Sequence, residues 1–183
     1  MLELGAYWGH YSMWLKKKLP NSIVHMIEPE LQNLNAGKYN FEINELDGRF
    51  TNAFVGKGHF CVDQYIIESE IRTLDILHSD IQGYELEMLN DCSNALTENK
   101  VNYIFISTHS QLIHNEILKK IASYNYRIEI SSDFENDTTS YDGLVFASNK
   151  NISPIFKDFK PLGRQDIGEA STSQLLRFLS DLK

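Results

Sequence analysis

The chain has 183 residues, which suits one α/β domain with a short appendage. Its formal net charge of −8 argues against a general nucleic-acid or anionic-membrane surface. Two cysteines, Cys61 and Cys92, have no metal-site spacing, and no apolar run is long enough for a membrane-spanning helix. No signal segment is apparent, so we expect a cytoplasmic protein without nucleic-acid or membrane partners.

Short apolar runs alternate with helical patterns along the chain, as in α/β proteins. Strands are predicted at residues 1–6, 23–28, 49–56, within 71–80, and at 101–107, 126–131 and 143–148, and residues 58–63 are predicted to extend the third as a hairpin. Helices are predicted at residues 10–19, 29–44, 84–96, 112–124 and 171–182. Because the last two strands are consecutive, we expect a mostly parallel sheet with an antiparallel hairpin at one edge.

Two helices have apolar positions that we expect to be buried. In the helix at 84–96 these are Leu86, Met88, Leu89 and Leu96. The last helix is amphipathic, and we expect its broad apolar face to dock on the domain or on a second subunit. This face contains Leu175, Leu176, Phe178, Leu179 and Leu182. We divide the chain into a main domain at 1–149 and a C-terminal extension at 150–183 that carries this short helix.

The opening stretch, MLELGAYWGHYS, leads from a strand into a glycine turn. In open α/β sheets, ligands bind beyond the carboxyl ends of the strands, and Gly5 and Gly9 allow the backbone to approach a ligand closely. The spacing lacks the G-x-G-x-x-G of dinucleotide sites and the Gly-Lys-Ser/Thr of a phosphate loop. Glu28, at the end of the second strand, is placed to accept ribose hydroxyls. Glu3 suits a ligand with a positive centre, which favours S-adenosylmethionine.

Five pieces of the chain, LELGAYWGHYS, IEPE, HSDIQGYELEML, IFISTHS and YDGLVFAS, resemble in this order the FkbM-type family of class I S-adenosylmethionine-dependent methyltransferases. The resemblance implies a Rossmann-like three-layer α/β sandwich, whose seven-stranded and mostly parallel sheet has an antiparallel last strand. It also implies S-adenosylmethionine as methyl donor and an oxygen acceptor on a sugar, lipid or polyketide-like molecule. Two features differ from this family: Tyr7 stands where many methyltransferases have glycine, and the helices that usually precede the first strand are absent. We therefore expect the N-terminal lead-in to be missing.

The resemblance also assigns residues. The predicted donor-binding residues are Glu3, Gly5, Ala6, Gly9, Glu28, Asp80 and Gln82. Asp80, Gln82, Gly83 and Glu85 match the element that follows the fourth strand in such families.

Methyl transfer to a hydroxyl benefits from a base that removes the proton. The candidates are His78, Asp80, His109 and His114. His109 follows the fifth strand and is expected beside Asp80, so we hypothesise that His109 is the general base and Asp80 its partner. His78 is expected to be packed deeper, His114 to be exposed, and Asp142 to have a secondary role.

Several alternatives stay open. Asp80 and another carboxylate could hold Mg²⁺ for an acceptor diol. The chain could also be a non-catalytic or truncated methyltransferase-fold module, or, less favoured, an NAD-dependent oxidoreductase. The leading prediction is a methyltransferase that acts on oxygen of a small molecule or glycan, with a homodimer as a possible assembly.

Overall fold

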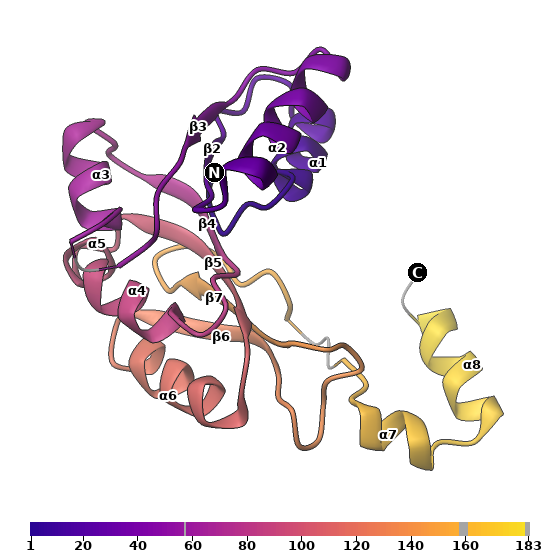
Figure 1. Cartoon of the computed structure of the whole chain (residues 1–183). Coiled ribbons are helices and arrows are strands. Elements are labelled where there is room, and N and C mark those ends of the chain that lie inside the picture. The colour runs from indigo at the N-terminus through magenta and orange to yellow at the C-terminus, as the bar shows by residue number, and fades with distance from the viewer. Residues whose placement is uncertain (57, 158–160, 182–183) are drawn as a thin grey trace.

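Seven strands form one sheet in the order β3-β2-β1-β4-β5-β7-β6 in the computed structural model, which describes residues 1–56, 58–157 and 161–181 (Figure 1). The strands are β1 (Leu2–Leu4), β2 (His25–Ile27), β3 (Arg49–Thr51), β4 (Leu74–Ser79), β5 (Val101–Thr108), β6 (Tyr126–Ser132) and β7 (Gly143–Asn149). All pairings are parallel except those of β7, which runs antiparallel to both β5 and β6. The predicted fold class, with its antiparallel last strand, is confirmed.

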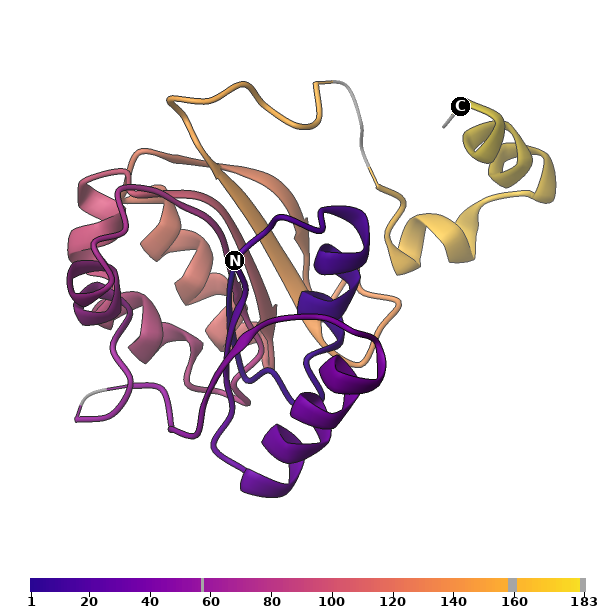
Figure 2. The same ribbon diagram turned by 90° about the horizontal axis from the view of Figure 1, so that it is seen from above.

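Helices cover both faces of the sheet (Figure 2). The helices are α1 (His10–Lys18), α2 (Leu31–Ile43), α3 (Val62–Glu68), α4 (Glu85–Asp91), α5 (Ser93–Thr97), α6 (Gln111–Ala122), α7 (Arg164–Glu169) and α8 (Thr172–Asp181). On one face, α1 and α2 lie over β1 to β3, and on the other α3 to α6 lie along the sheet. None of the helices in the described ranges is long and apolar enough to cross a lipid bilayer.

Each face has its own apolar core. The larger core joins the sheet to α3–α6 and includes Leu77, Ile104 and Met88, all fully buried. The smaller core, on the side of α1 and α2, contains Met26 and Phe41. Of the positions predicted to be buried in the helix at 84–96, Met88, Leu89 and Leu96 are buried and Leu86 is partly exposed.

The region after β3 differs from the prediction. The hairpin expected at 58–63 is wrong, because Val55 and Phe60 form one isolated bridge and α3 begins at Val62. Val62 and Ile66 are buried one helical turn apart, which is a helix period and not a strand period. Residue 57 lies outside the described residues.

The helix predicted at 84–96 is divided into α4 and α5. The side chain of Asp63 on α3 accepts the backbone N–H groups of Asn94 (2.9 Å) and Ala95 (2.8 Å) in the first turn of α5. These N–H groups therefore have a partner outside the helix, which is the role of an N-terminal cap.

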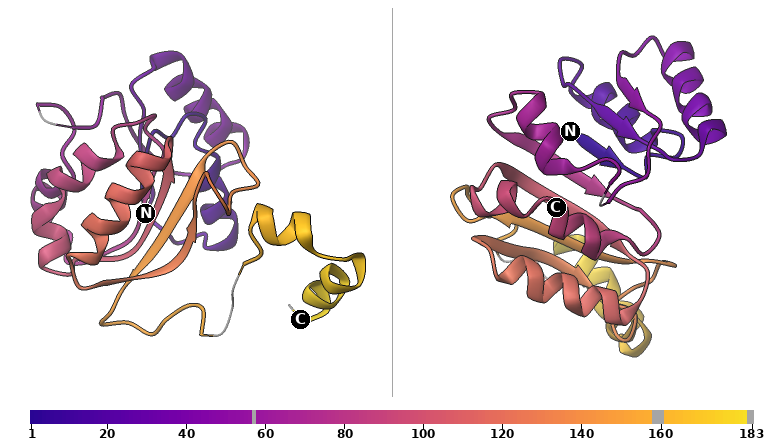
Figure 3. Two further views of the ribbon diagram at one scale, coloured as in Figure 1. Left: turned by 90° about the horizontal axis from the view of Figure 1, so that it is seen from below. Right: turned by 60° about the vertical axis from the view of Figure 1, so that its left-hand side comes forward.

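The segment after β7 contains α7, which the sequence did not predict, and the predicted terminal helix α8. The backbone N–H of Arg164 donates to Asp137, and its guanidinium donates to the carbonyl groups of Phe134 and Glu135. These bonds attach α7 to the loop between β6 and β7. In Figures 1 and 3, α8 projects away from the sheet, and none of its described residues is buried. The expected docking of its apolar face on the domain is therefore wrong, and docking on a second subunit stays a prediction. Leu182, predicted on its apolar face, lies outside the described residues.

An open apolar groove of about 390 Å³ lies on the sheet over β4, β5, β7 and β6. It is lined by Ile76, Tyr103, Phe105, Ile130, Leu144, Phe146, Ile155 and Phe156. The rings of Phe105 and Phe146 stack at 4.2 Å in its floor. This groove contains neither Asp80 nor His109 among its lining residues, so it is separate from the polar site described next.

Candidate active site

The glycine loop after β1 has a left-handed backbone at three positions. The φ angles of Gly5, Tyr7 and Gly9 are 70°, 49° and 73°. Such angles are ordinary for glycine but uncommon for tyrosine. The backbone N–H of Tyr7 donates to Oε2 of Glu28 at 2.8 Å, which helps to hold this conformation. The loop therefore keeps a glycine-like shape at the position where the sequence differs from many methyltransferases.

The backbone N–H groups of this loop bind within the protein. Those of Gly5 and Ala6 donate to the carbonyl oxygen of Ile27, and that of Gly9 donates to the carbonyl oxygen of Ala6. With the bond from Tyr7 to Glu28, four N–H groups of the loop have internal acceptors. A phosphate-binding loop instead directs such groups at its ligand. The arrangement agrees with the sequence in disfavouring a pyrophosphate ligand.

Both acidic residues that were predicted to bind the donor are buried beside this loop. The carboxylate of Glu3 accepts hydrogen bonds from the backbone N–H and the hydroxyl of Ser12 near the start of α1. Burial raises the pKa of Glu3 to about 7, against the lowering effect of the bonds from Ser12. Oε1 of Glu28 accepts the backbone N–H of Glu30 at 2.9 Å. Both side chains support the loop, and their contacts with a donor stay predictions.

The loop lies against the carboxyl end of β4. The backbone N–H of Asp80 donates to the carbonyl oxygen of Leu4 at 2.9 Å. A Cβ atom added at Gly5 would lie 1.8 Å from the carbonyl oxygen of Asp80, so only glycine allows this approach. The exposed Gln82, with a φ of 54°, donates from Nε2 to Oδ1 of Asp80 at 3.4 Å. The structure thus places Asp80 and Gln82 at the edge of the predicted donor site.

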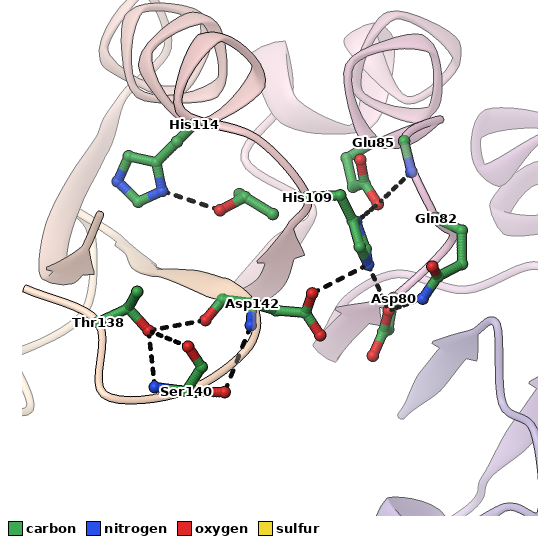
Figure 4. Close-up of polar contacts among 10 residues, drawn as sticks. Asp80, Gln82, Glu85, His109, His114, Thr138, Ser140 and Asp142 are labelled. Carbon is green, nitrogen blue, oxygen red and sulfur yellow. Dashed lines mark hydrogen bonds and ion pairs between the residues drawn. The ribbon is translucent and has the colours of Figure 1, made fainter. Parts of the chain in front are cut away.

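His109, directly after β5, lies among three carboxylates (Figure 4). Its Nε2 is 3.2 Å from Oδ1 of Asp80 and 3.7 Å from Oδ1 of Asp142. Its Nδ1 is 2.7 Å from Oε1 of Glu85. Neither ring nitrogen has regular hydrogen-bond geometry within the described residues, so these are close polar contacts of an imidazole with carboxylates.

The electrostatics around Asp80 suit proton transfer. Burial raises its pKa above the usual range, His109 opposes this effect, and the nearby carboxylates of Asp142 and Glu85 add to it. An acid with a raised pKa next to an imidazole is typical of groups that exchange protons near neutral pH. The predicted pair therefore lies at contact distance, and its catalytic role remains a hypothesis.

Sequence reasoning gave no separate role to Glu85, although its contact with His109 is shorter than that of Asp80. The sequence feature that pointed to Glu85 was its position in the D-I-Q-G-Y-E motif, five residues after Asp80. The contact itself depends on where α4 begins, which sequence periodicity does not determine to one residue.

The other candidate histidines lie elsewhere. His78 packs against the ring of Tyr11 at 4.4 Å, and burial lowers its pKa to about 4. His114 was expected to be exposed but is fully buried, and its ring nitrogens lie 2.9 Å from the hydroxyl oxygens of Thr108 and Ser131. The prediction that His114 is exposed is wrong, because the face of α6 that carries His114 packs on the sheet. His114 connects α6 to β5 and β6.

Across the ranges that the structure describes, no group of three or more His, Cys, Asp or Glu side chains is arranged to hold a metal ion. The magnesium alternative therefore gains no support from this arrangement.

Comparison with known proteins tests the resemblance to FkbM-type methyltransferases. Residues 59–128 match the family model described as Methyltransferase FkbM domain. The resemblance to FkbM-type methyltransferases is confirmed. The matched segment begins after the glycine loop and includes Asp80, Gln82, Glu85 and His109. No curated protein compared with the chain matches it.

Solved methyltransferase structures share the fold of this chain. It is similar to the methyltransferase FkbM from Methylobacillus flagellatus KT, with 21% identity, a TM-score of 0.63, and 80% of this chain and 42% of that chain covered. It is also similar to TrmK of M. capricolum, solved with S-adenosyl-homocysteine, with 16% identity, a TM-score of 0.59 and coverages of 98% and 75%. A third is a precorrin-6y C5,15-methyltransferase from Geobacter metallireducens GS-15, with 12% identity, a TM-score of 0.56 and coverages of 81% and 78%. The chain spans less than half the length of the Methylobacillus protein.

Proposed function

We propose that the FkbM-type chain is an S-adenosylmethionine-dependent methyltransferase that acts on a hydroxyl group of a small molecule or glycan. The observation that carries this proposal is the position of the His109 ring, 3.2 Å from Asp80 at the strand end that touches the glycine loop. A donor site and a proton-accepting pair are then next to each other. In-line methyl transfer needs this proximity, because holding donor and acceptor close together supplies much of the rate.

The residues of the loop fit a cationic nucleoside better than an anionic one. Glu3 and Glu28 are buried beside the loop and Asp80 lies at its edge, and the ionised forms of these acids favour a positive charge. Each oxygen of the Glu28 carboxylate has a second lone pair after accepting its backbone N–H, which a ribose hydroxyl could use. Glu3, Gly5, Ala6, Gly9, Glu28, Asp80 and Gln82 are therefore kept as the proposed donor-binding residues.

When bound, S-adenosylmethionine supplies an electrophilic methyl group on a sulfonium. The chain itself must orient the acceptor hydroxyl and take its proton. Nε2 of His109 is the proposed proton acceptor, and the carboxylates of Asp80 and Asp142 stabilise the imidazolium that forms. The same carboxylates add to the negative potential that retains a cationic donor.

Two titrations test the ligand class. Isothermal titration with S-adenosylhomocysteine should show binding, and titration with NADH should show none. Binding of NADH alone would contradict the proposal and favour an oxidoreductase, whereas binding of neither would favour a non-catalytic module.

Activity requires a second experiment. The protein is incubated with S-adenosylmethionine and a panel of sugars, lipids and hydroxylated polyketide-like compounds, and release of S-adenosylhomocysteine is measured. For an accepted compound, we expect His109→Ala to reduce kcat on the order of 10²-fold or more, the usual range for loss of a general base, with unchanged affinity for S-adenosylhomocysteine. Near-full turnover by this variant would rule out His109 as the base.

A further inference from the structure

Glu85 is a fully buried carboxylate in the first turn of α4, with 0% exposure. Its Oε1 accepts the backbone N–H of Gly83 at 3.1 Å and lies 2.7 Å from Nδ1 of His109. Its Oε2 is buried and has no hydrogen-bond partner among the described residues. A buried carboxylate is costly unless it is paired, so a charged or donating neighbour must stabilise it. His109 is the ionisable neighbour that the structure places in contact with it.

The two ring nitrogens of His109 face different surroundings. Nδ1 faces Glu85, which is fully buried, whereas Nε2 faces Asp80 and Asp142, whose side chains are 30% and 29% exposed. The partner of one ring nitrogen decides which tautomer a neutral histidine adopts. Glu85 is closer to the ring than either aspartate and is fully buried, so solvent screens its attraction for a proton least. A proton on Nδ1 leaves Nε2 with a free lone pair at the more exposed side of the ring.

From these contacts we infer that Glu85 is a positioning residue that holds His109 in the Nδ1–H tautomer, so that Nε2 faces the acceptor. This inference rests on the proposed function and changes the pairing expected from the sequence. Glu85 orients the ring, while Asp80 lies on the side where the acceptor hydroxyl would come. In serine hydrolases, a buried Asp holds the catalytic His in the same way.

Glu85 could instead serve only to stabilise the turn before α4. Its bond to the N–H of Gly83 supports the turn between β4 and α4, where Gln82 and Gly83 have positive φ angles. If this were its whole role, substitution would lower stability without any specific effect on the tautomer of His109. The experiment must therefore observe the ring itself.

The tautomer can be read by two-dimensional ¹⁵N–¹H NMR of protein labelled at its histidines, over a pH titration and without any acceptor. The signals of His109 are assigned by their absence in His109→Asn. In the wild-type protein, we expect the neutral ring to be predominantly the Nδ1–H tautomer. The Nε2–H tautomer in the wild-type protein would overturn the inference without any further variant.

Two variants then compare the two carboxylates. Glu85→Gln keeps the volume and an oxygen for the N–H of Gly83 but removes the charge, and we expect the ratio of Nδ1–H to Nε2–H to fall about tenfold or more. Asp80→Asn removes the charge at the other nitrogen, and we expect the Nδ1–H tautomer to persist. A change of tautomer in Asp80→Asn but not in Glu85→Gln would overturn the assignment.

Turnover gives a separate measurement for any compound that the acceptor panel identifies. We expect Glu85→Gln to lower kcat on the order of 10²-fold or more with little change in KM or in affinity for S-adenosylhomocysteine, because ground-state binding does not use the tautomer. If S-adenosylhomocysteine does not bind the wild-type protein, the proposed function fails. The NMR result still decides whether Glu85 holds the ring.

Discussion

The carboxyl group of Glu3 makes the stability of the fold depend on pH. Burial raises its pKa from 4.5 to about 7. The folded state therefore retains a proton that the unfolded state has lost between these values, so stability falls as the pH rises through this window. The full penalty is present above pH 7 and absent below about pH 4.5, and by the shift it is on the order of 3 kcal/mol.

We expect Glu3→Gln to remove this penalty. Urea unfolding gives the free energy of unfolding at pH 5 and at pH 8. Its decrease from pH 5 to pH 8 should be larger in the wild-type protein than in the variant. His25 and His78, whose pKa values burial lowers to about 4, act in the opposite direction below pH 6.5. They are present in both proteins, so the difference between the two proteins isolates Glu3. Equal pH slopes in both would contradict the raised pKa.

The sequence predicted the main polar residues of the site because a simple rule of sheets applies. Asp80 and His109 each follow a parallel strand, and neighbouring parallel strands end at the same edge. The role of Glu85 did not follow, because a side chain on a helix reaches a neighbour only if the helix begins at one particular residue. The burial of His114 was missed for a related reason: on α6, an imidazole can satisfy both nitrogens with hydroxyl groups and pack inside.

At the level of elements, the glycine loop depends on its contact with the end of β4. Gly5 has a φ of 70°, and any side chain there would collide with the backbone carbonyl of Asp80. We expect Gly5→Ala to lower the free energy of unfolding by about 3 kcal/mol or more, and to abolish binding of S-adenosylhomocysteine in the folded fraction.

Gly58→Ala is the matched control for Gly5→Ala. Gly58 also has a positive φ, 82°, but an added Cβ atom there would have no heavy atom of the described residues within 4 Å, apart from its chain neighbours. We expect Gly58→Ala to lower the free energy of unfolding only by the conformational strain, about 1 kcal/mol, and to retain donor binding. Urea unfolding and calorimetry measure both effects. Equal losses in the two variants would show that backbone strain, and not contact with Asp80, governs Gly5.

The secondary structure was predictable where periodicity was strong and local. All seven strands were predicted, because β-branched and apolar runs are short and bounded by turns. The third strand was predicted too long, since it ends at Thr51, and α3 was missed because its first two residues, Val62 and Asp63, lie within the segment predicted as a hairpin strand. The division between α4 and α5 depends on Asp63, which is about 30 residues away in sequence. Such a contact cannot be read from a local window.

At the level of the whole molecule, two apolar surfaces lie outside the main cores. One is the groove over β4, β5, β7 and β6, and the other is the apolar face of α8, where Leu176 and Leu179 are 61% and 60% exposed. Exposed apolar patches of this kind commonly mark places of interaction. The predicted homodimer and the division at residue 149 stay predictions that sedimentation and limited proteolysis can address.

We expect the folded protein to bind the apolar dye anilinonaphthalene sulfonate at the groove. Ile155→Ser should weaken the fluorescence enhancement, because Ile155 lines the groove and is 48% exposed. Leu112→Ser is the matched control, since Leu112 is 68% exposed on α6 and does not line the groove. Far-ultraviolet circular dichroism would check that both variants are folded. An equal reduction in both would place the dye elsewhere.

Because β7 lies between β5 and β6, the sheet cannot be completed during synthesis until the last strand has left the ribosome. β5 is complete at Thr108, but its free edge is paired only when Gly143–Asn149 has been made. At usual rates of translation, this interval lasts a few seconds. During that time, an apolar strand has unpaired backbone groups on one side, which is the condition under which nascent chains associate. The last strand in the sequence thus protects the middle of the sheet, and release of the chain before residue 143 would leave that edge open.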